Sequence, residues 1–398
     1  MSTSSARTRD ALWARHGAEW RHPVQIASQW REAASIDRRL LRYEVHGAWW
    51  ETLAARGITL LVTREYEHLV MALGASKEGP ALSYMPLPHP SGLAVDRARG
   101  TVYVASTRNP NQVYDLMPAD GVLQRRDVKV EPVEGRPLVP VRSRFFPGCL
   151  YMHDLAVIGG TLFVTAVGQN AVARLGDDGR HEAAWWPACI DTPKGPIFSR
   201  NHIQLNSIAA GRGLSTSYFS ASAATIGRRR PGHPNFPVDR RGVIFSGATR
   251  EPVATGLTRP HSARLHGGLW VNNSGYGELG RVTGGTFVPA AQLPGWTRGL
   301  CFDGDVAFVG TSRVIPRFSQ YAPGLNVNDS VCGIHAVDTR SGTILGGVVW
   351  PYGNQIFALE CVPRTFTTGF PFRVGSKLES KQAHTLFYAF RTALGDGE

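Results

Sequence analysis

The sequence predicts an all-β fold, a six-bladed β-propeller with a short α-helical N-terminal extension. A strand–turn–strand unit recurs along the chain, the pieces of a further unit lie at the two ends of the repeat region, and the composition favours strands and turns. The chain has 398 residues, of which 42% are hydrophobic, 44 are Gly and 26 are Pro. Closed all-β architectures often use such a length as one domain.

The first 57 residues differ from the rest of the chain. Large apolar side chains recur there among Arg and Glu, which predicts short amphipathic helices packed on the outside of the main domain. The apolar residues are Trp13, Trp20, Ile26, Trp30, Leu40, Leu41 and Trp49. An aromatic, basic helix on a membrane surface is the alternative interpretation. We therefore assign residues 1–57 to a helical extension.

From Ile58 the pattern changes to short β-rich runs, which we assign to a propeller over residues 58–375, followed by a tail over residues 376–398. Each repeat is a strand, a tight turn and a second strand, and a further pair of candidate strands follows. Four strands are the size of a propeller blade. The five copies are SGLAVDRARGTVYVAS (91–106), HDLAVIGGTLFVTA (153–166), NSIAAGRGLSTSYF (206–219), HSARLHGGLWVNNS (261–274) and RGLCFDGDVAFVGT (298–311).

The sixth blade requires both ends of the propeller region. The segment 58–73 supplies outer strands without a first strand, whereas 355–363 supplies a first strand without successors. Pairing the two would close the ring and remove free sheet edges, which otherwise promote aggregation. Seven blades is the alternative, because blade counts from sequence are prone to error.

The repeat also aligns one residue at the start of each innermost strand, at one level around the central channel. These residues are Ser91, His153, Asn206, His261, Arg298 and Gln355. A spacer position would repeat one small or apolar residue, whereas this set holds two imidazoles, two amides, a hydroxyl and a guanidinium. The pattern predicts a functional site, although channel residues that only bind one another and trapped water are the alternative.

Two imidazoles from alternate blades suit a divalent metal such as zinc, iron or copper. His153 and His261 are the first candidates, and His89 or His202 would complete a three-nitrogen set. Asp154 follows His153, and strand alternation turns it away from the channel, which leaves a hydrogen bond to a ligand histidine as its possible role. No compact HxH or HExxH motif supports the metal.

Other polar residues complete the candidate site. Arg298 would pair with a substrate carboxylate or phosphate, and Tyr276 would exchange a proton if a positive site lowered its pKa. With Asn206 and Asp154 these are the candidate catalytic residues, while the candidate substrate contacts are Ser91, Gln355, Arg313 and Arg228. Two insertions, 220–242 and 312–330, lie on the same face and are expected to cover the channel.

Composition limits the remaining possibilities. The net charge of +12 is mostly dispersed, and the run Arg228–Arg230 lacks an accompanying nucleic-acid recognition motif, so nucleic-acid binding is not expected. Five scattered cysteines predict neither a disulfide nor a zinc framework. The sequence contains neither a signal peptide nor an apolar membrane span, so we expect a cytoplasmic protein. It leaves the oligomeric state open.

The stretch TGLTRPHSARLHGGLWVNNSGYGELGRV, followed by LPGWTRGLCFDGDVAFVGTSR and CGIHAVDTRSGTI, resembles an uncharacterised bacterial family of proteins of unknown function. The resemblance implies a six-bladed propeller, distantly similar to NHL-type and gluconolactonase-like propellers, some of which hold a channel metal. This chain departs from the family's pattern in its two insertions and at Gln355, where an acidic residue looks usual. A shared fold does not transfer function.

The leading hypothesis is a metal-dependent enzyme acting on a small, polar, anionic metabolite or natural-product intermediate in the channel. Lyase, hydrolase, isomerase and oxygenase chemistry all stay open. The alternative is a non-catalytic binding or scaffold propeller that recognises a protein or glycan through its insertions. A polyanion-binding protein driven by net charge is a third possibility.

Overall fold

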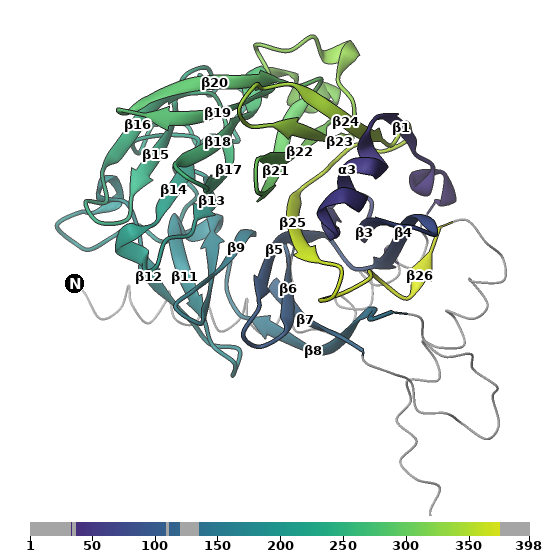
Figure 1. Cartoon of the computed structure of the whole chain (residues 1–398). Helices are drawn as coiled ribbons and strands as arrows, with labels where there is room; N and C mark the ends of the chain where they lie inside the picture. Colours follow the sequence, from purple (N-terminus) through teal and green to yellow (C-terminus); the bar gives the residue numbers. More distant parts are fainter. Residues whose placement is uncertain (1–32, 34–36, 109–110, 120–134, 375–398) are drawn as a thin grey trace, which may run out of the picture.

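The computed structural model describes residue 33 and residues 37–108, 111–119 and 135–374. Six sheets are arranged around a central axis (Figure 1), which confirms the six-bladed β-propeller. Each blade has four antiparallel strands that run from the axis outward. In chain order they are β5 (Pro90–Asp96), β6 (Thr101–Ser106), β7 (Asn111–Pro118) and β8 (Leu138–Phe146); β9 (Met152–Ile158), β10 (Thr161–Ala166), β11 (Ala171–Leu175) and β12 (His181–Trp185); β13 (Leu205–Ala209), β14 (Tyr218–Ala221), β15 (Gly242–Ser246) and β16 (Pro252–Leu257); β17 (Pro260–Leu265), β18 (Leu269–Asn273), β19 (Glu278–Thr283) and β20 (Thr286–Gln292); β21 (Trp296–Asp303), β22 (Val306–Ser312), β23 (Gly333–Asp338) and β24 (Ile344–Val349).

The sixth blade joins the two ends of the propeller. Its first strand is β25 (Ala358–Pro363), and its outer strands are β2 (Ile58–Arg64), β3 (Leu69–Ser76) and β4 (Gly79–Pro86). Strands β2 and β25 are antiparallel, with Leu61 opposite Glu360. The ring therefore closes through backbone hydrogen bonds between residues far apart in the sequence.

Two short strands extend the outer edges of neighbouring blades. Strand β1 (Glu44–Gly47) pairs with β24, and β26 (Phe372–Arg373) pairs with β4. Both cover backbone groups that an edge strand would otherwise expose. The extension therefore contributes a strand to a neighbouring blade in addition to its helical part.

The described part of the extension also contains helical turns. A 3-10 helix spans Arg38–Leu41, and α3 (Trp49–Arg56) packs against the blades formed around β3 and β24. Trp49 is fully buried, with its ring 6.0 Å from that of Phe308 in an edge-on contact. The expected helical positions Trp13, Trp20, Ile26 and Trp30 lie outside the described residues, as does the tail 376–398.

The core consists of six apolar clusters, one between each pair of neighbouring blades. Alternation along each strand sends side chains into the clusters on both faces, which explains why most inner strands are buried throughout. The described residues include no helix of the length and apolarity needed to span a membrane.

Gly92 makes a close contact between neighbouring blades. A Cβ atom at this position would lie 2.6 Å from the Leu155 nitrogen and 2.8 Å from the His153 oxygen. We expect Gly92→Ala to lower the free energy of unfolding by about 2 kcal/mol, because backbone on both sides cannot move aside easily. Denaturant unfolding would measure this loss. The matched control is Gly213→Ala, where nothing lies within 4 Å, and equal stability of the two variants would contradict this account of blade packing.

Candidate functional site at the ring axis

The six repeat-aligned residues all lie at the beginning of the innermost strands or just before them. Each is at most 5% exposed. The residues are Ser91, His153, Asn206, His261, Arg298 and Gln355. His153 on β9 and His261 on β17 come from alternate blades, yet their ring centroids are 5.7 Å apart. The structure therefore brings both predicted histidines together at the axis.

Phe357, two residues after Gln355, lies among the polar groups. Its ring centroid is 5.0 Å from that of His153 and 5.8 Å from that of His261, both in edge-on contacts. The Cζ atom of Arg298 lies 4.2 Å from the same centroid, within the range of a cation–π interaction. An aromatic ring thus supports two imidazoles and one guanidinium.

His261 holds Arg298 through a direct hydrogen bond. The Arg298 Nη2 lies 3.1 Å from His261 Nε2, and the His261 Nδ1 lies 2.8 Å from Ser262 Oγ. Because a guanidinium only donates, Nε2 must be the acceptor and Nδ1 carries the proton. Burial lowers the pKa of His261 well below 6.5, and nearby Arg298 lowers it further. His261 is therefore neutral, with both ring nitrogens occupied.

The ring of His153 is buried, and one of its nitrogens lacks a hydrogen-bond partner among the described residues. Its Nδ1 makes no hydrogen bond to the described residues, although the residue is only 4% exposed. Burial lowers the pKa of His153 well below 6.5, and the Arg298 charge adds to the effect. The imidazole is therefore neutral at physiological pH and has a free nitrogen facing its buried surroundings.

Arg298 is also connected to a buried carboxylate. With its amide oriented so that both polar atoms are paired, Gln355 accepts from Arg298 and donates to Glu65 Oε2 at 3.2 Å. Glu65 further accepts from Thr107 and lies 3.6 Å from the Nε of Arg108. Burial raises the pKa of Glu65, while its hydrogen bond to Thr107 and the positive charges of Arg298 and Arg108 oppose that rise. The carboxylate compensates part of the buried positive charge.

A second ring of residues stands two positions before the first. His89, Tyr151, Gln204 and Arg259 occupy this position in four consecutive blades, with φ between 43° and 53°. This left-handed conformation is uncommon for residues other than glycine, and it clusters at functional sites. The shared backbone geometry shows that the repeat fixes the position of both sets of residues around the axis.

Arg259 is the second buried cation of the site. Its Nη1 donates to Gln204 Oε1 at 2.7 Å, and its Cζ lies 4.0 Å from the ring centroid of Tyr321. Burial lowers its pKa to about 10, so it stays charged at neutral pH. No carboxylate of the described residues forms an ion pair with Arg259, in contrast to the many surface arginines that have acidic partners.

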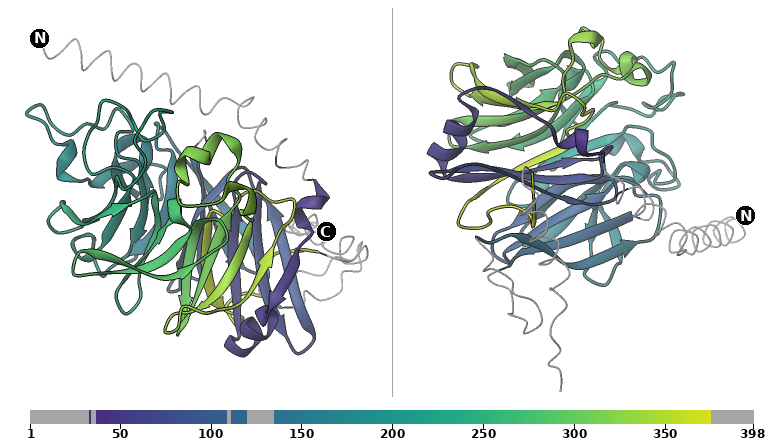
Figure 2. Two further views of the ribbon diagram at one scale, coloured as in Figure 1. Left: turned by 90° about the horizontal axis from the view of Figure 1, so that it is seen from above. Right: turned by 90° about the vertical axis from the view of Figure 1, so that its right-hand side faces the viewer.

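The two insertions pack together above this region. Val238 of the first insertion and Val314 and Tyr321 of the second form one apolar cluster with Trp296. The Trp296 ring also lies 5.2 Å from Arg298 Cζ. Figure 2 shows the light-green helical turns of the second insertion on one side of the ring. The insertions are therefore joined to the axial site through Trp296, Arg298 and Arg259.

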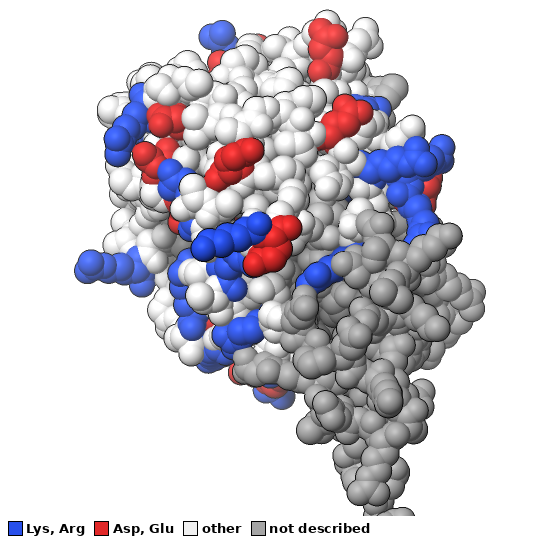
Figure 3. All heavy atoms as spheres, turned by 45° about the vertical axis from the view of Figure 1, so that its right-hand side comes forward, with Lys and Arg blue, Asp and Glu red and all other residues white. Residues whose placement is uncertain are grey.

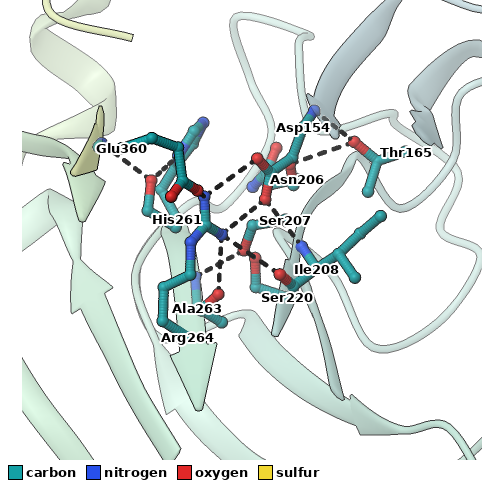
Figure 4. A network of polar contacts seen from close by, with 12 residues as sticks. Asp154, Thr165, Asn206, Ser207, Ile208, Ser220, His261, Ala263, Arg264 and Glu360 are labelled. Carbon is teal, nitrogen blue, oxygen red and sulfur yellow. Dashed lines mark hydrogen bonds and ion pairs between the residues drawn. The ribbon is translucent and has the colours of Figure 1, made fainter. Parts of the chain in front are cut away.

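Three predicted site residues serve the framework beneath the site. Asp154 forms a buried ion pair with Arg264 at 2.8 Å and accepts from the Ile208 backbone nitrogen (Figure 4). Ser91 Oγ lies 3.0 Å from the Met152 carbonyl oxygen, and Asn206 donates to the Pro260 carbonyl. Asn206 Oδ1 is buried without a partner among the described residues. Alternation turns Asp154 to the blade interface, where its side chain pairs with Arg264 rather than with either axial histidine.

The other predicted residues have partners of their own. The His89 ring contacts that of His68, with centroids 4.3 Å apart, and the His202 backbone binds Asn170. The Tyr276 hydroxyl donates to Asp239. Arg313 is exposed and donates to the Pro351 carbonyl, while Arg228 lines a separate pocket in the first insertion.

The donor set at the axis does not fit a divalent metal. Within residues 37–108, 111–119 and 135–374, no three His, Cys, Asp or Glu side chains are grouped to bind one. His261 Nε2 accepts from Arg298 and its Nδ1 is bonded to Ser262, and the guanidinium would repel a cation.

Sequence reasoning missed Glu65, Tyr151, Arg259 and Phe357. The signal for Tyr151 and Arg259 was present, because each stands two residues before its repeat position, as His89 does. Glu65 lies in the segment TREYEH between β2 and β3, where no repeat position singles it out. Phe357 is an apolar residue at an inner strand and has no distinguishing feature in sequence.

Solved structures with a similar fold share little sequence with this chain. A chain of the nidogen/laminin complex aligns with a TM-score of 0.50 and 10% identity, covering 77% of this chain and 98% of that chain. A gluconolactonase from Xanthomonas campestris aligns with a TM-score of 0.43 and 13% identity, covering 74% of this chain and 86% of that chain. A catalytically inactive virginiamycin B lyase from Staphylococcus aureus, solved with quinupristin, aligns with a TM-score of 0.38 and 13% identity. The alignment covers 75% of this chain and 78% of that chain. At such identities the likeness shows the fold alone.

A family model matches residues 47–369, and its description is a domain of unknown function, DUF4915. The match spans nearly the whole propeller and confirms the resemblance inferred from sequence. A comparison with curated protein sequences finds no match.

Proposed function

Because the chain belongs to DUF4915, a family whose description names no activity, we propose from the geometry that it is an enzyme that binds a small organic anion at the ring axis. In this proposal Arg298 and Arg259 bind the anion, and His153 transfers a proton. The observation that carries the proposal is the buried His153 ring, whose Nδ1 has no partner among the described residues.

An unpartnered buried nitrogen points to a missing ligand. Leaving a buried polar atom unpaired costs about 1–3 kcal/mol, so buried polar groups nearly always have a protein or water partner. His153 is held by Phe357 and Tyr151 on its sides, with the Tyr151 ring centroid 5.3 Å away. A polar substrate atom or a water molecule is the natural partner of its free nitrogen.

The charge distribution favours an anion as that ligand. Arg298 and Arg259 are both buried, whereas Glu65, which lies 3.6 Å from the Nε of Arg108, is the buried acid that acts on Arg298. A planar guanidinium binds carboxylate and phosphate well. His261 acts as a positioning residue, because its neutral Nε2 orients Arg298 without adding charge.

His153 has the protonation state of a general base. Its lowered pKa leaves it neutral at neutral pH, so it can accept a proton from a bound substrate without first losing one. The positive charge of Arg298 would stabilise negative charge that develops on the substrate after proton removal. Proton abstraction next to a carboxylate, as in elimination or isomerisation, is the chemistry that these residues support best.

The experiment combines an anion screen with a variant that changes His153 alone. Small carboxylates and phosphate esters are tested for stabilisation of the full chain in thermal denaturation, and those that bind are followed by mass spectrometry. We expect His153→Gln to remain folded and to bind the same anion, but not to convert it. Conversion by His153→Gln at the native rate, or an absence of stabilising anions, would overturn the proposal.

Elemental analysis of untagged protein tests the competing metal hypothesis. We expect less than one equivalent of zinc, iron or copper, unchanged in a folded His153→Ala/His261→Ala variant. One equivalent of metal that is lost in this variant would show that the histidines bind it and would contradict the metal-free site. Binding of the anion without any conversion would instead support a non-catalytic binding propeller.

A further inference from the structure

A pocket lies in the first insertion, and its lining contains none of the axial residues. Its volume is about 460 Å³, and it is formed by the loop between β14 and β15 together with residues of β15 and β16. The lining residues include neither the two axial histidines nor Arg298. The volume falls within the range of about 300–1,000 Å³ that is typical of small-molecule sites.

Four arginines line this pocket and no acidic residue does. They are Arg228, Arg229, Arg240 and Arg241. Over the described part of the chain, none of the four has a carboxylate within ion-pair distance, and the neighbouring Asp239 is bound by Thr258 and Tyr276 instead. Four uncompensated cations around one hollow create a strong positive potential.

Several arginines elsewhere in the protein are paired with acidic side chains. Arg56, Arg142, Arg174 and Arg250 each lie within 3.1 Å of an acidic oxygen. On the face shown in Figure 3, basic and acidic side chains are interspersed. What distinguishes the pocket is that four arginines without an ion pair among the described residues line one hollow, where their charge is available to a ligand.

The rest of the pocket wall is largely apolar. Phe236 is half-buried there, and Val243 is buried at the beginning of β15. Backbone contacts fix the loop, since the Arg240 nitrogen donates to Thr258 Oγ1 and the Arg229 guanidinium donates to the Asn235 carbonyl. An apolar wall beside several guanidinium groups suits a ligand that has both an apolar part and more than one negative charge.

We infer that this pocket is a second binding site, for a phosphorylated small molecule with an apolar or aromatic part. A phosphate offers several acceptor oxygens to the planar forks of neighbouring arginines, which a single carboxylate does not. The inference does not rest on the proposed function, because the two sites share no residue.

Calorimetric titration of the full chain with ADP and with pyrophosphate tests the inference. The variant is Arg240→Gln/Arg241→Gln, and the charge-matched control is Lys77→Gln/Arg212→Gln, which changes exposed residues remote from the pocket lining. We expect both probes to bind the native chain, ADP more tightly, and the variant to lose at least about tenfold in affinity, since each charge-assisted hydrogen bond contributes strongly. The control should retain native affinity.

Three outcomes would overturn the inference. An equal loss of affinity in the variant and in the control would show that net charge, rather than a specific site, binds the probes. Equal affinity for succinate and pyrophosphate would contradict the phosphate class, and tighter binding of a single-stranded oligonucleotide than of ADP would point to nucleic acid instead. Thermal denaturation of each variant verifies its folding, which should be native because the altered side chains are exposed.

Discussion

Replacing Arg298 by glutamine is expected to weaken binding of the axial anion by about 100-fold or more, since truncating one partner of a buried, hydrogen-bonded charge pair costs about 2–5 kcal/mol. The guanidinium is 5% exposed, bonded to His261 and stacked on Phe357. Calorimetry measures this loss as the dissociation constant of the tightest-binding anion from the screen, compared between the native chain and the variant. Arg313→Gln is the matched control, because Arg313 is exposed and its guanidinium binds a backbone carbonyl.

Arg298→Gln is also expected to destabilise the fold, because Glu65 would lose a compensating charge while remaining buried. The double variant Arg298→Gln/Glu65→Gln removes both charges and should recover much of the stability. Anion binding should remain lost in this variant. A stable double variant that binds the anion with native affinity would show that Arg298 is not the anion ligand.

Asp154→Asn is expected to lower the free energy of unfolding by about 3–5 kcal/mol, as breaking a buried ion pair leaves an uncompensated charge. The Asp154 carboxylate accepts from Arg264 at 2.8 and 3.2 Å and from the Ile208 nitrogen at 2.9 Å. Without this carboxylate, the nearest acid to Arg264 is Glu360, at 3.9 Å. Burial raises the pKa of Glu360 to about 7. Asp154, Arg264 and Glu360 come from different blades. Loss of the ion pair therefore weakens the contact between blades beneath the site.

Denaturant unfolding at neutral pH measures this effect against a surface pair. Asp191→Asn removes the partner of Arg250, whose side chain is 34% exposed, and should cost less than about 1 kcal/mol. The double variant Asp154→Leu/Arg264→Met should recover most of the loss, since apolar side chains of similar size often replace buried ion pairs without cost. A loss at Asp154→Asn no larger than at Asp191→Asn would contradict the framework role.

The repeat made the blade count and the axial residues predictable from sequence. Its strands alternate regularly, so the register that buries Leu155 and Ile158 also places His153 at the start of β9. The edge strands β1 and β26 belong to no repeat, and only tertiary contact shows that they complete sheets. The residues at the ring axis could therefore be predicted from the sequence, whereas the edge strands β1 and β26 could not.

The chemistry of the axial residues was less predictable than their position. Sequence shows that His261 is present, but not that Arg298 and Ser262 occupy both of its nitrogens. That pairing depends on side-chain orientation across two blades. The same limit applies to Arg228, which the sequence placed with the channel and the structure places in the insertion pocket.

The central claim, that the ring axis binds a small organic anion, is tested most directly by a crystal structure of the full chain with the tightest-binding anion of the screen. We predict the anionic group against the free donors of Arg298, with a polar ligand atom within hydrogen-bonding distance of His153 Nδ1. An anion found only in the arginine pocket of the first insertion, with the axial residues unchanged, would contradict the claim.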